Sequence, residues 1–268
     1  MIEPKKKMLF ISLFQQLKLF TKTLCIFFHE DHIYIQGMDS SHICLYESKF
    51  MASWFHHYEK NEADYGMICL DPNIVSSILS MAEDGFIELF YENEPGSLDI
   101  HICKENGENG EKAEKAEKAE KGWNYDKHFS IPLIEYECEL MSIPENDYDI
   151  QFILPSKKIC ELTSQLSIFG DELKIHCSET NGEIVLGTVG DSGEMKVNIH
   201  MDDVSEFTIS EGEVFDASFS LNYVHKYCLT SKLTSDIQFS LMNNFPMRIR
   251  YQLDENFIMF FIAPKVED

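Results

Sequence analysis

Residues 134–147 read IEYECELMSIPEND, and the sequence on either side of them carries the same succession of predicted elements. The apolar residues of this segment follow neither a helical nor a strand period, and Pro144 interrupts them. Such a pattern favours an extended connector over a helix or a buried strand. We therefore predict two similar domains, residues 1–133 and 148–268, joined by residues 134–147.

The first half predicts two helices, each followed by strands. Apolar residues recur at helical spacing over residues 10–24, and the alternating segments 25–36 and 42–50 follow them. Asp71 and Pro72 then provide an N-cap and a proline at the first helical position. A hairpin over residues 86–103 completes this half.

The second half repeats the pattern. Pro155 and Ser156 open a helix for which Gly170 is the expected C-cap, and a hairpin over residues 172–189 follows. Ser220 starts a fourth helix, which the hairpin at residues 236–253 follows. Four helix-plus-strand units in two pairs indicate an α+β fold built from a repeat.

The charge of the chain restricts how it could meet DNA. Among 268 residues, 46 are acidic and 22 are Lys or Arg, which gives a net charge of −24. An acidic surface repels nucleic acid, whose nonspecific binding depends on Lys and Arg at phosphates. Any DNA-binding role must therefore use a localised basic surface or the topology of an assembly.

The cysteines and the hydrophobic pattern indicate an intracellular protein without a membrane span. The eight cysteines are scattered singly and form no C-x-x-C pair, which argues against a disulfide framework or a zinc site. No apolar run approaches the length that a membrane helix needs. Residues 105–122, rich in Glu, Lys and Ala, read as a solvated insertion in a hairpin, either disordered or a frayed helix.

The sequence offers no motif for catalysis. It lacks G-x-S-x-G, a phosphate-binding loop with its Lys, H-E-x-x-H and G-x-G-x-x-G. The adjacent His56 and His57 have no acidic or Cys partner at ligand spacing. We therefore predict no catalytic residue, no metal site and no cofactor, and a metal-dependent nuclease remains only a minor alternative.

Three short strings carry a family resemblance. MDSSH occupies residues 38–42, SIPE residues 142–145, and APKVED residues 263–268. Between them, LSIFGDELKIHC, GTVGDSGEMKV and FSLNYV follow in the expected order. By these strings the chain resembles, over almost its whole length, the proliferating cell nuclear antigen family of DNA sliding clamps.

The resemblance implies a DNA-clamp fold in which two similar domains, linked by an interdomain connector, each place two helices toward a central hole and antiparallel sheets outside. It further implies a homotrimeric ring around double-stranded DNA that tethers DNA polymerase, a clamp loader and other client proteins. Such a protein is nuclear and is not an enzyme. The alternative within the fold is a checkpoint-type clamp subunit of a hetero-oligomeric ring.

Client proteins of this family insert a short peptide into a hydrophobic pocket under the connector, where a few buried anchors dominate the binding energy. Methionine and aromatic side chains suit such a deformable surface. The backbone of residues 264–266 is expected to bond the peptide as well. By position in the motifs, the pocket comprises Met38, His42, Met141, Ile143, Phe245, Pro246, Phe261, Ile262, Ala263 and Pro264.

The resemblance also assigns the subunit contact and the DNA-facing surface. Two edges, residues 125–133 and 188–197, are expected to pair between subunits. Pro132 has no N–H, so it is expected either at the end of the paired segment or facing away from the partner strand. The second helix offers no cation, whereas Lys5, Lys6 and Lys7 extend the basic set. The interface residues are Lys127, Phe129, Ile131, Val189 and Met195, and the DNA-facing residues are Lys18, Lys22, Lys157, Lys158, Lys226 and Lys232.

Overall fold

The computed structural model describes residues 1–2, 4–60, 66–82, 86–92, 96–103, 126–180, 182–229 and 233–266. The predicted insertion at residues 105–122 therefore lies outside the described residues, as does Lys232. No helix within the described part of the chain combines the length and the hydrophobicity that crossing a bilayer requires.

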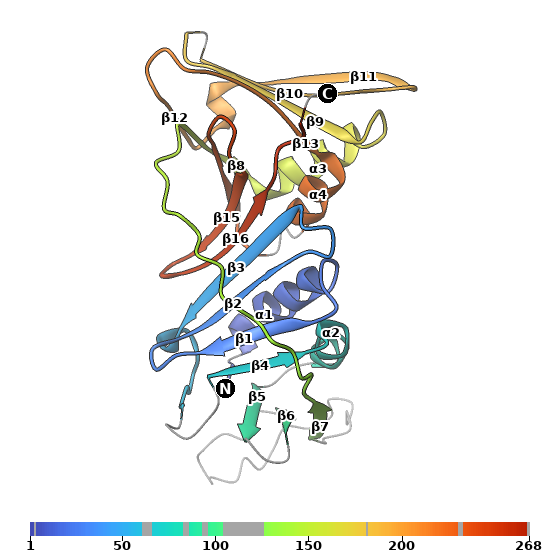
Figure 1. Cartoon of the computed structure of the whole chain (residues 1–268), viewed down its shortest axis with the longest axis vertical. Helices are drawn as coiled ribbons and strands as arrows, with labels where there is room; N and C mark the ends of the chain where they lie inside the picture. Colours follow the sequence, from blue (N-terminus) through green and yellow to red (C-terminus); the bar gives the residue numbers. More distant parts are fainter. Residues whose placement is uncertain are drawn as a thin grey trace, which may run out of the picture.

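The elements alternate between helices and strands in the order expected (Figure 1). Up to the connector they are α1 Pro4–Leu17, β1 Leu24–Phe28, β2 His32–Met38, β3 Cys44–Met51, the 3₁₀ turn η1 Ala52–Trp54, β4 Met67–Leu70, α2 Pro72–Ser80, β5 Phe86–Glu92, β6 Ser97–Cys103 and β7 Lys127–Pro132. After it come β8 Ile150–Pro155, α3 Ser156–Leu166, β9 Glu172–Ser178, β10 Glu183–Gly190, β11 Gly193–Ile199, the 3₁₀ turn η2 Met201–Asp203, β12 Glu206–Ile209, β13 Val214–Ser220, α4 Leu221–Cys228, β14 Asp236–Leu241, β15 Met247–Leu253 and β16 Asn256–Ile262.

Local signals account for most helix starts. The Asp71 side chain accepts a hydrogen bond of 2.8 Å from the Asn73 amide, and Pro72 occupies the first turn, so the predicted start of α2 is confirmed. The predicted starts of α3 and α4 are confirmed as well. The first helix is shifted: it spans Pro4–Leu17 rather than residues 10–24, because Leu24 already belongs to β1.

The largest sheet runs through both halves of the chain. Its strand order is β12-β8-β14-β15-β16-β3-β2-β1-β4, and every pairing is antiparallel. The junction between the halves is the ladder of β3 with β16, in which Tyr46 lies opposite Phe260. One continuous sheet therefore joins the N-terminal and C-terminal parts of the chain (Figure 1).

Two smaller sheets lie at the two ends of the elongated molecule (Figure 1). One has the order β11-β10-β9-β13 and the other the order β5-β6-β7, so that β11 and β7 are edge strands. Pro132 is the last residue of β7, as expected. The expected edge at residues 188–197 comprises the end of β10, the turn in which Gly193 has a φ of +127°, and most of the edge strand β11.

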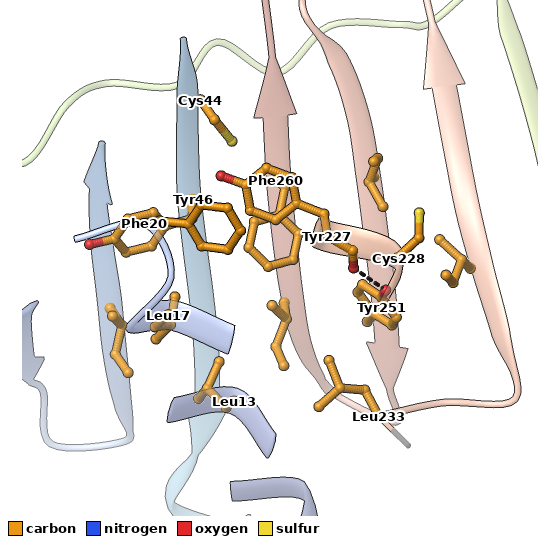
Figure 2. Packing of buried hydrophobic residues seen from close by; sticks show 14 of the residues in the cluster. Leu13, Leu17, Phe20, Cys44, Tyr46, Tyr227, Cys228, Leu233, Tyr251 and Phe260 are labelled. Atoms are coloured by element: carbon orange, nitrogen blue, oxygen red, sulfur yellow. Dashed lines mark hydrogen bonds between the residues drawn. The ribbon is translucent and has the colours of Figure 1, made fainter. Parts of the chain in front are cut away.

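The core lies between the large sheet and the helices. Phe20 stacks on Tyr227 with ring centroids 4.1 Å apart, and Tyr227 also packs on Phe260 at 4.1 Å (Figure 2). The Gln16 amide donates a hydrogen bond of 2.8 Å to the Tyr227 carbonyl, which ties α1 to α4. The halves thus share one core, and the α+β class with antiparallel sheets is confirmed.

Gly170 has a different role from the one expected. Helix α3 is capped at Ser167, so the assignment of Gly170 as its C-cap is wrong. A Cβ atom at Gly170 would lie 2.7 Å from the Val189 carbonyl oxygen and 2.7 Å from the Thr188 hydroxyl. Glycine is therefore needed here because two backbone segments approach each other closely.

Candidate functional site

The connector is tied to the sheet at two points. Residues 133–148 contain neither helix nor strand and run past β1, β2 and β3 (Figure 1). The Ile134 amide donates a hydrogen bond of 2.8 Å to the Cys69 carbonyl on β4. Farther along, the buried Gln36 side chain donates to the Met141 carbonyl at 2.9 Å and accepts from the Met141 amide at 2.7 Å. These two hydrogen bonds hold the middle of the connector on the sheet.

The strand register brings three of the predicted pocket elements together. Met38 lies opposite Leu45, and Leu45 lies opposite Phe261. Directly opposed residues share one face of a sheet, and here that face is the one that also bears Gln36 and hence the connector. We call it the connector face. Met38, Phe261, Met141 and the nearby Ile143 of the connector are all half-buried.

Ile262 takes no direct part in this surface. It lies opposite Cys44 and Met247, on the face of the sheet that packs against the helices, and its side chain is completely buried. The reason is the alternation of side chains along β16, which places neighbouring residues on opposite faces. Ile262 therefore lies beneath the connector face and is not exposed on it.

The MDSSH turn is organised by the buried carboxylate of Asp39. This carboxylate accepts hydrogen bonds from the amides of Ser41, Ile43 and Cys44 at 2.6–2.8 Å and from the Tyr223 hydroxyl at 2.6 Å. Burial alone would raise the pKa of Asp39, but the bonds from Tyr223 and the three amides outweigh burial and lower it. The turn presents His42, which is exposed at a φ of 56°.

The segment after β16 closes one side of the same region. The Ala263 amide donates to the Ile43 carbonyl at 3.0 Å, and the Lys265 amide donates to the Ser218 carbonyl at 2.7 Å. Because its N–H is already used within the subunit, Lys265 is not a backbone donor for a bound peptide. Ala263 is exposed and Pro264 half-buried.

Phe245 and Pro246 lie in the turn between β14 and β15 and are both exposed, Phe245 with 39% of its surface accessible. The next residue, Met247, pairs with Ile262 at the end of β16. The turn therefore lies beside the start of the C-terminal segment. An exposed phenylalanine at this place extends the apolar surface beyond the connector.

Two arginines were missed by the sequence argument. Arg248 lies opposite Phe261 and therefore on the connector face, and its guanidinium carbon is 4.4 Å from the centroid of the Tyr148 ring. Arg250 follows two residues later on the same face, over the ring of Phe257. Burial lowers the pKa of both arginines. The alternation in MRIRY, residues 247–251, was the available signal for outward-facing arginines.

The predicted DNA-facing lysines differ in how exposed their side chains are. Lys157 and Lys158 are exposed in the first turn of α3, and Lys22 is exposed after α1, whereas Lys18 is half-buried. Lys226 is also half-buried, with its Nζ atom 5.9 Å from the Tyr223 ring centroid. These residues come from or follow the helices, and Lys232 lies outside the described residues.

The extension of this basic set toward the N-terminus is wrong for two lysines. Lys7 has only 5% of its surface exposed. The Lys6 ammonium group donates to the Trp54 carbonyl and lies 5.4 Å from the indole centroid. Both side chains are used in packing α1, a role that the local sequence pattern does not reveal.

The expected interface residues lie on or beside the two edge strands. On β7, Lys127 donates to the Met81 carbonyl at 2.9 Å, Phe129 is half-buried, and Ile131 points into the subunit with 2% exposed. Met195 is half-buried on β11, and Val189 is exposed near the end of the neighbouring β10. The side chain of Ile131 therefore belongs to the core, and its backbone pairs with Leu98 of β6, so Ile131 does not itself face a neighbouring copy.

The sequence of this chain is similar to those of known proteins. Residues 142–266 match the family described as proliferating cell nuclear antigen, C-terminal domain. Over 97% of the chain, the sequence is 25% identical to proliferating cell nuclear antigen 2 of Plasmodium falciparum, of which 96% is covered. Over 87% of the chain, it is 24% identical to proliferating cell nuclear antigen of Caenorhabditis elegans, of which 84% is covered. The motifs, the fold and these matches agree: residues 142–266 match the C-terminal domain of the proliferating cell nuclear antigen family of DNA sliding clamps, and almost the whole chain is similar to proteins of that name.

Proposed function

We propose that three copies of this protein close a ring around double-stranded DNA, with residues 1–133 and 148–268 as the two domains of each copy. The observation that carries the proposal is the position of β7 and β11, which are sheet edges at opposite ends of the elongated subunit (Figure 1). Pairing of β7 in one copy with β11 in the next is a head-to-tail contact. A contact of this kind closes into a ring when the rotation between copies permits it.

The backbone of β7 is suited to such a contact. The Leu133 amide bonds the Gly96 carbonyl, so residues of odd number in β7 face β6 and residues of even number direct their N–H groups to the open side. His128 and Ser130 therefore present donors to a neighbouring strand. Pro132 presents none, and because it ends the strand it limits the contact to the residues before it.

The ring would hold DNA by topology more than by affinity. The exposed Lys22, Lys157 and Lys158 offer few phosphate contacts in each subunit, and such contacts weaken as salt increases. The net charge of −24 leaves the remaining surface acidic and discourages DNA from binding elsewhere. Shallow contacts inside a closed ring permit sliding.

The connector face is the proposed site for client peptides, including those of DNA polymerase and a clamp loader, and the proposed compartment is the nucleus. Met38, Phe261 and the connector residue Ile143 supply the apolar contacts, and the exposed His42 and Phe245 border them. In this function the protein acts as a scaffold and not as an enzyme.

The ring is tested by the solution mass of the purified chain. Light scattering should give three times the 31.1-kDa subunit over a wide range of concentration and salt. The Ser130→Pro variant removes one outward N–H of β7 without removing a bond to β6 and should lower the mass toward that of a monomer. The Ser130→Ala variant keeps this N–H and should remain trimeric.

Retention on DNA supplies the second measurement. The wild-type ring, once loaded, should remain on circular duplex DNA in salt that weakens phosphate contacts and should leave after the circle is cut. A wild-type chain that stays monomeric at every concentration would reject the homotrimer and favour a subunit of a hetero-oligomeric ring.

A further inference from the structure

Three cysteines meet where the connector begins. Cys25 on β1 and Cys69 on β4 are directly opposed in the antiparallel ladder, and their Sγ atoms lie 2.6 Å apart. Each has 3% of its surface exposed. Cys138 belongs to the connector itself and is half-buried. No sequence motif groups them, because residues 25, 69 and 138 are far apart along the chain.

The backbone places the first two thiols as close as a sheet permits. The Phe28 amide bonds the Gly66 carbonyl, so residues of even number in β1 form the hydrogen bonds with β4. The Cys69 carbonyl instead accepts from Ile134, on the other side of β4. Cys25 and Cys69 are therefore a non-hydrogen-bonded pair, the type in which opposed side chains approach most closely.

The connector thiol, Cys138, contacts the same pair through Cys25. Contact with Cys69, burial and contact with Cys138 together raise the pKa of Cys25. Contact with the Cys25 thiol lowers the pKa of Cys69, and burial opposes this shift. Cys25 thus lies next to both other thiols, and Cys138 is the most exposed of the three.

We propose that Cys138, Cys25 and Cys69 form a peroxide-responsive thiol relay, in which the connector thiol is oxidised first and the buried Cys25–Cys69 pair becomes the final disulfide. The relay is a modification site under the connector, and it does not depend on ring formation or on DNA. Its order follows from exposure, since the oxidant reaches Cys138 first, and from the central position of Cys25.

Oxidation passes through the three thiols in three steps. The Cys138 thiol reduces a peroxide to the corresponding alcohol or water and becomes a sulfenic acid. The Cys25 thiol attacks that sulfur, which forms the Cys25–Cys138 disulfide and releases water. The Cys69 thiolate then attacks the Cys25 sulfur, and Cys138 leaves as a thiolate that takes up the proton lost from Cys69. In sum, two thiols lose two hydrogens and one peroxide is reduced.

The intermediate has a structural consequence. While Cys25 is bonded to Cys138, the connector is covalently attached to β1, next to the point where Ile134 is hydrogen-bonded to β4. After the thiol–disulfide exchange the connector is no longer covalently attached, and the Cys25–Cys69 disulfide links β1 to β4 instead.

The test uses the full chain, purified reduced, treated with hydrogen peroxide, alkylated and analysed as non-reduced peptides by mass spectrometry. Wild type should accumulate the Cys25–Cys69 link, and dithiothreitol should reverse it. Cys69→Ser should stop at the Cys25–Cys138 link. Cys138→Ser should form the Cys25–Cys69 link at least about tenfold more slowly, because buried thiols react only through local opening.

Two variants complete the design. Cys25→Ser should form neither link, whereas Cys103→Ser, which removes another half-buried cysteine outside the cluster, should react like wild type. Circular dichroism before oxidation establishes that each variant is folded. Wild-type protein that forms no intramolecular link among these three cysteines would overturn the proposal, as would a Cys138→Ser variant that reacts at the wild-type rate.

Discussion

The two halves of the chain share a plan but use their helices differently. In each half a pair of helices packs against the sheet, α1 with α2 and α3 with α4. The first turn of α3 carries the exposed Lys157 and Lys158, whereas Lys6 and Lys7 in the first turn of α1 pack against the protein. A repeated fold therefore does not imply repeated function, because lysines in the first turn of a helix face solvent in one half and the protein in the other.

The largest effect is expected where the halves are joined by Asp39 and Tyr223. Replacing Asp39 with Ala removes a carboxylate that accepts four hydrogen bonds, and it leaves buried donors unpaired. We expect the free energy of unfolding to fall by about 4 kcal/mol at neutral pH. Urea titration measures this loss, and Ser40→Ala, at an exposed neighbour, should change little.

The same variant has a defined pH dependence. Because the folded-state pKa of Asp39 is lowered, its carboxylate stabilises the fold above the unfolded pKa of about 3.9 and loses this effect as the pH falls through the folded value. The difference in unfolding free energy between wild type and Asp39→Ala should shrink below about pH 4. A difference that stays constant down to about pH 2 would contradict the assigned ionisation.

The connector face provides the next largest effect. Replacing Phe261 with Ala should weaken a client peptide by about 2 kcal/mol, because a buried aromatic anchor loses its partner. Calorimetric titration with a peptide of the family's client motif measures this. Phe257→Ala is the matched control, since Phe257 is half-buried on the same face of the same strand but farther from the C-terminal segment. An equal loss of peptide affinity in both variants would contradict the assignment of the pocket to the Phe261 end of β16.

A smaller effect is expected at Gln36, which holds the connector from the N-terminal half. Gln36→Ala removes both bonds to Met141 and should weaken the same peptide by about 1 kcal/mol, since each neutral hydrogen bond contributes modestly. Hydrogen exchange should show faster exchange at the Met141 amide. Gln238→Ala, which removes a bond to Gln151 on the same sheet, should leave both measurements unchanged.

The smallest effect addresses the comparison of the halves directly. Changing Lys157 and Lys158 together to Gln should reduce the slope of log K against log salt for duplex DNA by up to about 2, if both contact phosphates. Fluorescence anisotropy over a salt series measures the slope. The pair Lys6→Gln and Lys7→Gln should not alter it, because those side chains face the protein. A larger change for this second pair would reverse the assignment.

Local chemistry made much of the fold predictable. The Asp71 and Pro72 start of α2 and the hairpins of the second half depend on residues close together in the sequence, and they were predicted correctly. The first helix was misplaced because its apolar stripe continues into β1. Gly170 was misread because its need for glycine arises from Thr188 and Val189, which the sequence does not place beside it.

The candidate site was predictable only in outline. Family motifs pointed to Met38 and Phe261, and the strand register places both on one face. The bonds of Gln36 to the connector and of Asp39 to Tyr223 join residues more than 100 positions apart, 105 in the first case and 184 in the second. No local pattern encodes such partners, so these contacts required the three-dimensional structure.

The ladder between β3 and β16 has a consequence for biosynthesis. The Met51 amide bonds the Asn256 side chain across 205 positions of the chain, so β3 must wait for the synthesis of nearly the entire second half before its partner exists. At about 5–20 residues per second this interval lasts on the order of ten seconds or more. During that time the growing chain exposes an apolar strand edge, which makes it a substrate for chaperones that shield such edges.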